Sequence, residues 1–406
     1  MRILTFTSLF PDSTRPNFGV FIYQRMAHVA RRANNQVTVV APVPYVPAWV
    51  PGKKAHEYRS VPRQEKFGEL QVYHPRYPLL PKIGLTVHGL LMFLGAYRLV
   101  RRLIGQGVDC IDAHFVYPDG FAAVLLGRAF KVPVVASARG TDINLYPKIR
   151  SVRPLLKWTV RHAEGLIGVC SALSEEMIAL GAPREHVRTI GNGVDAKRFC
   201  PVEQATARRQ LKIPQDGKVV VAVGSLIIRK GYHLLIPAIA ELKRRGMTVR
   251  LFVAGEGEYR PKLEQRIREL GLEADVTLLG NVANDQLKHW YSAADVSCLC
   301  SSREGWANVL LESMACGTPV VASRIWGTPE VVVSDELGLL VDLNPQAIAD
   351  GLQTALRHTW DRARITAFAR QRSWDTVADE VENWLGERAG CGLSPKAARN
   401  TAGVPT

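Results

Sequence analysis

The stretch KVVVAVGSLIIRKG, residues 218–231, decides the fold that the sequence predicts. It begins with a run of Val and Ala and then reaches Gly224, which is typical of a buried parallel strand that ends in a tight loop. A helical pattern follows over 232–245, and TVRLFVAG over 248–255 is again strand-like. A strand, a helix and a second strand in this order predict a βαβ unit with a parallel sheet.

The same alternation continues on both sides of this stretch. Downstream, we expect helices over 260–270, over 284–292 and after Glu304, and strands in VTLLG (276–280), VSCLCS (296–301) and PVVAS (319–323). Upstream, a helix is expected around 20–33, and strands are expected in RILTFTSLF (2–10), QVTVVAPV (36–43), CIDAHF (110–115), VPVVASA (132–138) and GLIGVCS (165–171). The sequence therefore predicts an α/β protein with two Rossmann-like domains that face a central cleft.

The chain of 406 residues is longer than one typical domain and predicts about two. We expect an N-terminal domain over 1–200 and a C-terminal domain over 201–372. A helix over 373–390 is expected to pack back on the N-terminal domain, and the small, polar tail over 391–406 is expected to be disordered. The Pro-rich segment 44–81 shows no regular pattern.

Composition predicts a reduced, cytoplasmic protein. The seven cysteines are scattered and form no CxxC motif, which argues against both a disulfide framework and a zinc site. We find no secretory signal and no apolar run of the roughly 20 residues that a membrane-spanning helix needs. The longest uncharged apolar stretch, 83–97, predicts a buried helix or, alternatively, a helix that lies in a membrane interface.

Positive charge is concentrated in the first half of the chain. Residues 1–200 hold 27 Lys and Arg against 13 Asp and Glu, whereas residues 201–406 hold 25 against 24. This excess predicts an anionic partner, such as a membrane surface, a phosphorylated acceptor or nucleic acid, and an ordinary solvated surface explains it equally well. Nucleic acid is the least favoured partner, because no recognition motif occurs.

Two groups of residues in the second half suggest a diphosphate site. Arg229 and Lys230 follow the strand at 218–226, and two adjacent cations suit a diphosphate. In the segment 301–323, we expect Glu304 in a loop and Glu312 in a helix of small, apolar residues. A buried acid does not stabilise such a helix, because a buried carboxylate must be paired or neutralised. The amino end of that helix has free N–H groups and favours an anion.

The ordered set of motifs resembles the family-4 retaining glycosyltransferases, which have the GT-B fold. The most specific motif is Glu304, seven residues, Glu312 and then SMACGTPVVAS. The resemblance covers roughly residues 1–385, and the opening FPDSTRPNFGVFIYQR is similar to enzymes that build bacterial cell-surface polysaccharides, including exopolysaccharides. The other motifs in the set are DAHFVYPDG, RGTDIN, VCSALSEEM, IGNGVDAKRF, VGSLIIRKG and VAGEGEYRPKLE.

The resemblance implies roles for particular residues. Catalytic roles fall on Glu304, which contacts the donor sugar, on Lys230, which holds the diphosphate, and on His114, which touches the donor sugar. Glu312 binds the ribose hydroxyls of the nucleotide. The remaining donor-binding residues that the resemblance implies are Gly19, Gly224, Ser225, Arg229, Gly305, Asn308 and Val309.

Two departures from the family pattern affect specificity. Ser225 stands where the family often has Arg, and Arg229 is a candidate to replace that charge. Arg139 stands where the family often has His, in the loop that also holds Asp142. We therefore regard Arg139 and Asp142 as candidate acceptor-side residues, although turn chemistry explains Asp142 equally well.

The function that the resemblance implies is a retaining transfer of a sugar from a nucleotide-diphosphate sugar to a glycan or lipid-linked acceptor. The first domain then holds the acceptor and the second the nucleotide sugar. No carboxylate pair of the DxD type is placed to hold a metal, so we expect no metal and no other cofactor. We expect the protein in the cytoplasm, with the inner face of the plasma membrane as a further site. The alternatives are a nucleotide-sugar epimerase or glycan phosphorylase of similar architecture and, far less favoured, a nucleic-acid-binding protein.

Overall fold

The computed structural model describes residues 1–32, 34–79 and 84–390, which form two compact units. Unit 1 comprises Met1–Gly168, Ser174–Ile190 and the segment from Ala378 onward, and unit 2 comprises Val169–Leu173 and Gly191–Val377. The change at residues 190–191 lies about ten residues before the boundary that we predicted at 200. The tail predicted over 391–406 lies outside the described residues.

Unit 1 is built on an eight-stranded sheet with the order β10-β9-β8-β7-β1-β2-β5-β4, in which every neighbouring pair is parallel except β4 and β5. The first strand therefore lies between β2 and β7, where the chain switches direction along the sheet. The strands span β1 (Arg2–Phe6), β2 (Gln36–Val40), β4 (Gln64–Phe67), β5 (Leu70–Tyr73), β7 (Cys110–His114), β8 (Val134–Ala138), β9 (Gly165–Gly168) and β10 (Val187–Thr189).

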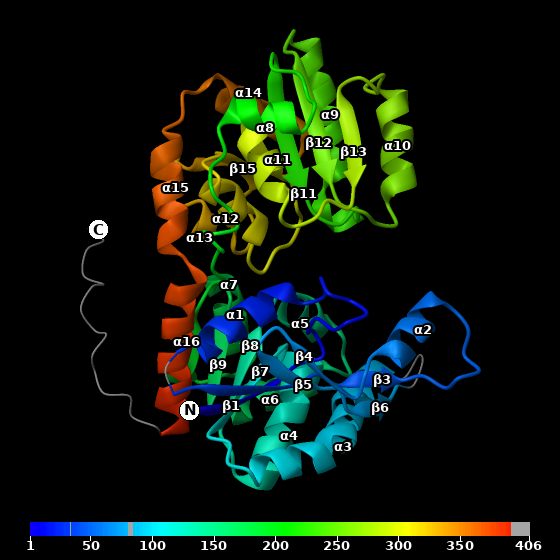
Figure 1. Ribbon diagram of the computed structural model, residues 1–406, viewed down its shortest axis with the longest axis vertical. Coiled ribbons are helices and arrows are strands. Elements are labelled where there is room, and N and C mark those ends of the chain that lie inside the picture. Colours follow the sequence, from blue (N-terminus) through cyan, green and yellow to red (C-terminus); the bar gives the residue numbers. More distant parts are fainter. Residues whose placement is uncertain (33, 80–83, 391–406) are drawn as a thin grey trace. The chain divides into compact units, whose positions relative to one another are not determined.

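Helices pack on this sheet, and α3, α4 and α6 lie beside one another (Figure 1). A short parallel pair, β3 (Val43–Tyr45) and β6 (Arg76–Pro78), extends the chain beyond β2 and β5. The helices of unit 1 are α1 (Val20–Ala30), α2 (Lys53–Ser60), α3 (Gly84–Ile104), α4 (Phe121–Phe130), α5 (Thr141–Asn144), α6 (Arg153–His162), α7 (Ser171–Ala179) and α16 (Trp374–Ala389), with short turns η1 (Val116–Gly120), η2 (Tyr146–Lys148) and η3 (Arg184–His186).

Helix α16 belongs to unit 1 from Ala378 onward. The Asp379 carboxylate lies 2.7 Å from the guanidinium of Arg32, which follows α1. The Asn35 amide donates to the Glu382 carboxylate at 2.8 Å. The last helix of the described residues is thus tied to residues near the beginning of the chain.

Helix α3 contains most of the apolar stretch noted in the sequence, and only one of its faces is buried. Met92, Ala96 and Val100 on that face are 0–1% exposed. The opposite face exposes Leu90 and Leu94. Within the described residues, no helix combines the length and apolar character needed to cross a membrane.

Unit 2 contains a six-stranded parallel sheet with the order β13-β12-β11-β14-β15-β16, which is the 3-2-1-4-5-6 order of a dinucleotide-binding fold. This order confirms the predicted second Rossmann-like domain. The strands are β11 (Lys218–Val223), β12 (Val249–Ala254), β13 (Val276–Gly280), β14 (Val296–Leu299), β15 (Val320–Ser323) and β16 (Gly338–Val341).

The helices of unit 2 cover both faces of its sheet, so the sheet is buried on both sides, as continuous runs of Val and Ala require. One core cluster includes residues of α9, α10 and α14, and a second includes residues of α11, α12 and α15. The helices are α8 (Gln204–Gln210), α9 (Tyr232–Arg244), α10 (Arg260–Glu269), α11 (Leu287–Ala293), α12 (Asn308–Ala315), α13 (Thr328–Val331), α14 (Pro345–Arg357) and α15 (Arg362–Gln371), with the turn η4 (Ile228–Lys230).

Candidate active site

In unit 2, the two predicted loops leave neighbouring strands at the same edge of the sheet. The loop 224–231 follows β11, and the loop 300–307 follows β14, which pairs with β11 in parallel. This is the point where the strand order reverses, and ligands of open α/β sheets bind outside the carboxyl ends of such strands. The topology therefore brings together two motifs that lie some 75 residues apart in the sequence.

Lys230 and Glu304 meet at this point and form an ion pair. The Lys230 Nζ atom lies 2.7 Å from Glu304 Oε1, and the Arg229 guanidinium lies 3.6 Å from Glu304 Oε2. Glu304 is 9% exposed, so this carboxylate is largely removed from water and needs its cationic neighbours. Two cations and one carboxylate are thereby held at the carboxyl edge of the sheet.

Hydrogen bonds to backbone carbonyls hold the two loops together. The Ser302 N–H donates to the Arg229 carbonyl at 2.8 Å, and Arg229 Nη1 donates to the Arg303 carbonyl at 2.6 Å. Gly231, between η4 and α9, adopts φ +73°, and a Cβ atom there would lie 1.7 Å from the Cys300 carbonyl oxygen. The close approach of the loops therefore depends on glycine at this position.

The other predicted donor residues of unit 2 border these loops. The Gly224 carbonyl accepts a hydrogen bond from the Tyr232 hydroxyl at 3.0 Å, and the next residue, Ser225, is exposed. Gly305 lies in the loop before α12, whose first two residues are Asn308 and Val309.

Helix α12 begins without a side-chain cap from the described residues and without an acid in its first turn, so its amino end keeps the polarity that favours an anion. The amide of Asn192 donates to the Asn308 side chain at 3.1 Å.

Glu312 lies one turn into α12 and faces α11. The Tyr291 hydroxyl donates to Glu312 Oε2 at 3.1 Å. Burial raises the pKa of Glu312 to about 7, and the Tyr291 hydrogen bond and the charges of Arg198 and Lys230 oppose that rise. The carboxyl group therefore changes its protonation state near neutral pH.

We predict that nucleotide affinity rises with pH through neutrality. If the Glu312 carboxylate accepts ribose hydroxyls, its protonation near a pKa of about 7 should make binding of a nucleoside diphosphate about tenfold weaker at pH 6 than at pH 8. Titration calorimetry at both values measures the ratio. Phosphate groups also titrate near pH 6, so the pH profile of Glu312→Gln is the control. An identical ratio in this variant would exclude Glu312 as the cause.

In unit 1, three further loops leave the central strands β1, β7 and β8 at one edge of the sheet. His114 is the last residue of β7, and Arg139 directly follows β8. Gly19 lies in the loop between β1 and α1, with φ +69°. A Cβ atom at Gly19 would lie 2.3 Å from the Leu9 carbonyl oxygen, so the loop folds back on itself only with glycine there.

His114 is buried between Asp112 and Arg139. Its Nδ1 atom lies 2.5 Å from Arg139 Nη2, and its Nε2 atom lies 3.1 Å from Asp112 Oδ2. Burial lowers the pKa of His114 to about 4, although the Asp112 carboxylate favours the charged form. Because a guanidinium only donates, Nδ1 must accept, and the neutral ring carries its proton on Nε2, toward Asp112.

Two more buried carboxylates organise these loops. Asp142 accepts hydrogen bonds from the backbone N–H groups of Val116 at 2.8 Å, Gly140 at 2.9 Å and Arg139 at 3.1 Å. Asp119 accepts from the Ser8 N–H, and burial raises its pKa to about 7. The Asp142 carboxylate thus fixes the Arg139 loop from within.

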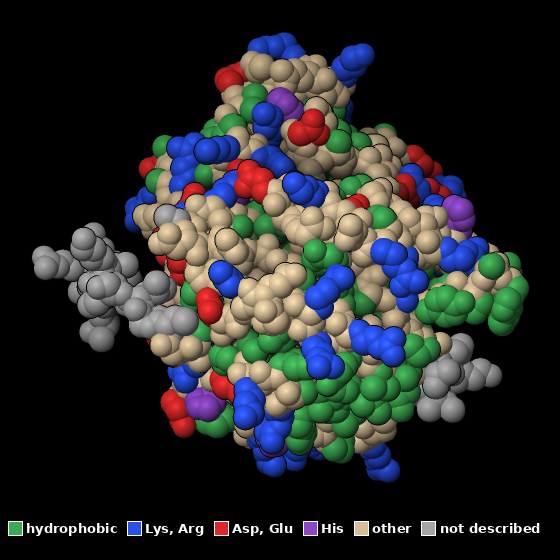
Figure 2. Space-filling model, turned by 60° about the horizontal axis from the view of Figure 1, so that its bottom comes forward, with side chains coloured by type: hydrophobic (Ala, Val, Ile, Leu, Met, Phe, Trp, Pro, Cys, Tyr) green, Lys and Arg blue, Asp and Glu red, His purple; other side chains and the backbone are tan. Residues whose placement is uncertain are grey.

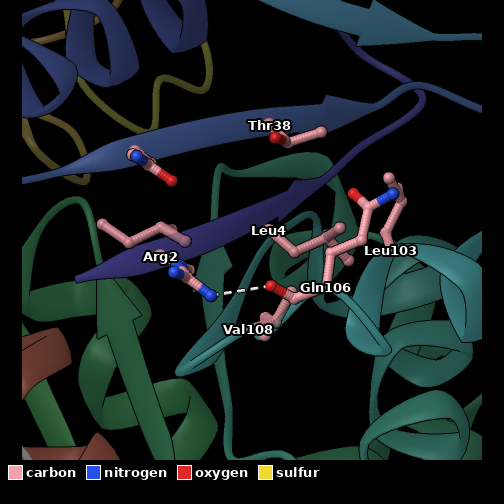
Figure 3. Close-up of a pocket in the computed structure, with 9 residues that line it drawn as sticks. Arg2, Leu4, Thr38, Leu103, Gln106 and Val108 are labelled. Carbon is pink, nitrogen blue, oxygen red and sulfur yellow. Dashed lines mark hydrogen bonds between the residues drawn. The ribbon is translucent and has the colours of Figure 1, made fainter.

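A cavity of about 210 Å³ lies at the opposite edge of the unit 1 sheet, at the amino ends of β1 and β2. Figure 3 shows Arg2 and Leu4 on β1, Thr38 on β2, and the hydrogen bond from Arg2 to the Gln106 carbonyl at 2.7 Å. This cavity lies away from the carboxyl edge and contains none of the predicted site residues. Within the described ranges, no three His, Cys, Asp or Glu side chains are grouped to hold a metal ion.

Sequence reasoning missed several residues of these sites. Asp112 and Arg25 are fully buried beside the His114 pair, and Arg25 donates to the Ser137 hydroxyl at 3.3 Å. Asp112 had a signal, because an acid two positions before His114 in a buried strand points to the same face of the sheet. Tyr291 had none, since it lies 21 positions before its partner Glu312 on another helix.

Comparisons with known proteins identify the family of this chain. Residues 203–372 match the family model described as Glycosyl transferases group 1, and residues 21–198 match Glycosyltransferase Family 4. The chain is also 30% identical to an uncharacterized glycosyltransferase of Methanocaldococcus jannaschii, over 80% of this chain and 86% of the relative. The chain belongs to the family-4 glycosyltransferases.

Two other relatives of this glycosyltransferase have names that state a biosynthetic process or a reaction. It is 27% identical to TuaC of Bacillus subtilis, a protein named for teichuronic acid biosynthesis, over 98% of this chain and 97% of TuaC. A GDP-mannose-dependent phosphatidylinositol monomannoside mannosyltransferase of Mycolicibacterium smegmatis is 29% identical over 73% of this chain and 76% of its own.

Solved structures show that the glycosyltransferase has the GT-B fold, as predicted. Sucrose-phosphate synthase of Thermosynechococcus elongatus superposes with a TM-score of 0.78 at 21% identity, covering 96% of this chain and 99% of the other. The Anabaena protein HepE, solved in complex with UDP-glucose, has a TM-score of 0.68 at 22% identity over 95% and 99%.

Proposed function

We propose that this glycosyltransferase uses a nucleotide-diphosphate sugar, retains the anomeric configuration and needs no metal ion. The observation that carries the proposal is the convergence of Lys230, Arg229 and Glu304 at the switch point of unit 2. A diphosphate that leaves the sugar gains negative charge, and fixed cations at that point stabilise it. The Glu304 carboxylate accepts hydrogen bonds from hydroxyl groups of the donor sugar.

Electrostatic stabilisation is then the main catalytic effect. Lys230 and Arg229 supply positive charge that a metal supplies in other enzymes, and the uncapped amino end of α12 adds N–H groups. We assign no covalent nucleophile. The acceptor hydroxyl attacks on the face from which the diphosphate departs, the bond from the sugar to the phosphate oxygen breaks, and the leaving phosphate takes the acceptor proton.

In unit 1 we assign a role in donor-sugar contact to His114 and in phosphate approach to Gly19, as the resemblance implies. Arg139 donates to His114 and fixes its tautomer, so we regard Arg139 as a positioning residue as well as a candidate acceptor contact. Asp142 has its carboxylate committed to backbone N–H groups, which supports a positioning role more than direct acceptor contact.

We propose a glycan or lipid-linked acceptor in cell-surface polysaccharide biosynthesis. The relative named for teichuronic acid biosynthesis and the phosphatidylinositol monomannoside mannosyltransferase support this class.

Sugar transfer without a metal is the direct test. Incubation with a panel of nucleotide sugars, followed by proton NMR of the released sugar or product, should give one donor whose product keeps the anomeric configuration. Excess EDTA should leave the rate within about twofold, because Lys230 and Arg229 supply the positive charge. Loss of activity in EDTA with recovery on adding Mg²⁺ or Mn²⁺ would contradict metal independence. Conversion of the donor sugar without transfer would identify an epimerase.

We further propose that unit 1 binds anionic membrane surfaces reversibly. Its α3 helix exposes Leu90, Leu94, Arg98 and Arg102 at spacings of four residues, which place them on one face, and Arg101 is exposed next to Arg102. Figure 2 shows hydrophobic side chains gathered on one face of the molecule with Lys and Arg side chains around them. Each basic residue near an anionic surface adds roughly 1 kcal/mol of attraction.

Vesicle binding should depend on the exposed face of α3. The whole chain is expected to sediment with vesicles containing phosphatidylglycerol at low salt, and less so at high salt because the charges are screened. Leu94→Glu should reduce the bound fraction severalfold. Val333→Glu in unit 2 is the control, since Leu94 is 58% exposed and Val333 57%. Absence of sedimentation at low salt would exclude the membrane proposal.

A further inference from the structure

Unit 1 contains a second cavity, of about 550 Å³. Its lining residues lie between positions 44 and 76, within the segment in which the sequence shows no regular pattern. It is lined by residues of β3, α2 and the turns that connect α2 to β4, together with Arg76 at the start of β6. Strand β3 follows the carboxyl end of β2, and β6 follows that of β5. The cavity therefore lies at the edge of the sheet that carries the loops after β1, β7 and β8.

Every charged side chain among the described residues that line this cavity is positive. Its lining includes Arg59, Arg63 and Arg76 and contains no Asp or Glu among those residues. Asp12, whose charge acts on Arg76, already binds Arg15 at 2.6 Å, and Glu65, two residues after Arg63, binds His74 at 2.9 Å.

Burial lowers the pKa of Arg76, and the neighbouring charge of Arg63 lowers it further. An anion in the cavity would relieve this repulsion.

The three arginines differ in how they are held. Arg59 Nη1 donates to the carbonyls of Pro47 at 3.0 Å and Val50 at 2.8 Å, and Arg76 donates to the carbonyls of Tyr58 and Val61. These two guanidiniums hold the wall of the cavity. Arg63 is exposed, and its guanidinium has no partner among the described residues, so its whole fork of donors is available.

An aromatic contact connects the cavity to the β1–α1 loop. Tyr58 lines the cavity, and the Arg15 guanidinium lies 5.1 Å from the centre of its ring and 4.7 Å from that of Phe18. Phe18 precedes Gly19, the predicted donor-phosphate residue. Tyr45, 56% exposed, offers an aromatic surface on the same cavity.

We propose that this cavity binds a phosphate ester group of the acceptor, with Arg63 as its main ligand; the inference rests on the proposed glycosyltransferase function. A guanidinium fork matches phosphate oxygens in a bidentate contact, and three neighbouring positive charges favour a dianion over a singly charged carboxylate. The Tyr45 ring then packs against the sugar or lipid chain that carries the phosphate.

Binding of defined phosphate esters to the full chain tests this site. Calorimetry with saturating uridine diphosphate, which fills the donor site, is run with inorganic phosphate, glucose 1-phosphate, geranyl phosphate and glucuronate. We expect a phosphate ester to bind and Arg63→Ala to weaken it at least tenfold, with a smaller loss in Arg63→Lys, which keeps the charge but not the fork. Tighter binding of glucose 1-phosphate would indicate an acceptor with a sugar phosphate, and tighter binding of geranyl phosphate would indicate an acceptor with a lipid phosphate.

The matched control is Arg128→Ala, an exposed arginine on α4 outside the cavity, which should bind the esters as the unaltered chain does. Equal affinity of Arg63→Ala and the unaltered chain, or tighter binding of glucuronate than of any phosphate ester, would overturn the proposal. Arg63→Ala should keep the melting temperature of the unaltered chain. Lys230→Ala should lose the binding of uridine diphosphate and keep the binding of the esters. If the unaltered chain binds no nucleotide but does bind the esters, that result contradicts the proposed function and not the phosphate site.

Discussion

Replacing Glu304 with Gln is expected to lower sugar transfer at least a hundredfold while the protein stays folded. The amide keeps the shape of the side chain and still accepts a hydrogen bond from Lys230, whose Nζ lies 2.7 Å from the carboxylate. In the proposed mechanism, the amide loses the negative charge that accepts hydrogen bonds from donor hydroxyls and pairs with both cations. Removal of one preorganised group of this kind costs about 10²–10³ in turnover. Initial rates with a saturating donor measure the loss.

Glu264→Gln is the control for this experiment. Glu264 also forms an ion pair, at 2.8 Å from Arg260, but the pair lies on the exposed surface of α10, where such pairs contribute little. Its rate should equal that of the unaltered chain. Near-normal transfer by Glu304→Gln would show that the site is assigned wrongly.

Gly231→Ala is expected to reduce the free energy of unfolding by at least about 3 kcal/mol, or to prevent folding of unit 2. The added methyl group would lie 1.7 Å from the Cys300 carbonyl oxygen, and backbone cannot move aside as the end of a flexible side chain can. The left-handed conformation at φ +73° adds about 1 kcal/mol of strain. Urea unfolding followed by circular dichroism measures the change.

Gly246→Ala separates these two causes. Gly246 has φ +78°, and no atom of the described residues beyond its chain neighbours lies within 4 Å of the place that an added methyl group would occupy. Alanine there carries the conformational strain without the collision, so this variant should lose only about 1 kcal/mol. Equal losses in the two variants would mean that the loops after β11 and β14 are not in close contact.

The sequence predicted the parallel strands well because most are short, largely apolar runs between turn residues. The strand expected over 276–280 has those bounds, and CIDAHF contains β7 at Cys110–His114. Strands expected to run longer, such as 2–10, end earlier because the functional loop begins inside the apolar run: β1 ends at Phe6. A buried loop and a buried strand have the same composition, so hydrophobicity does not separate them.

The segment 44–81 was the main failure of sequence reasoning. Its described residues, 44–79, form α2, the antiparallel edge strand β4, the parallel strands β5 and β6 and the end of β3, and β5 pairs with β2. Helix α2 is highly polar and buries only Ala55, so it lacks the apolar periodicity that identifies helices. Edge strands with one covered face carry a similarly weak signal.

Sequence reasoning found the candidate site residues that lie in the loop directly after a strand. Arg229, Lys230 and Glu304 lie in such loops, and the sheet order alone brings them together. Tyr291, the partner of Glu312, lies on another helix, and Arg139, which contacts His114, follows another strand, so only tertiary packing selects these partners. The apolar stretch 83–97 shows the same limit, because its composition does not tell which face of α3 is covered.

The path of the chain between the two units has a consequence for its synthesis. Unit 2 ends at Val377, whereas unit 1 requires the residues of α16 that follow. The second unit therefore leaves the ribosome complete while the first, although translated earlier, still lacks its last helix. A fragment that stops near residue 200 leaves Arg32 without Asp379 and Asn35 without Glu382. A truncated chain that ends at Val377 should thus contain a protease-resistant unit 2 and a protease-sensitive unit 1.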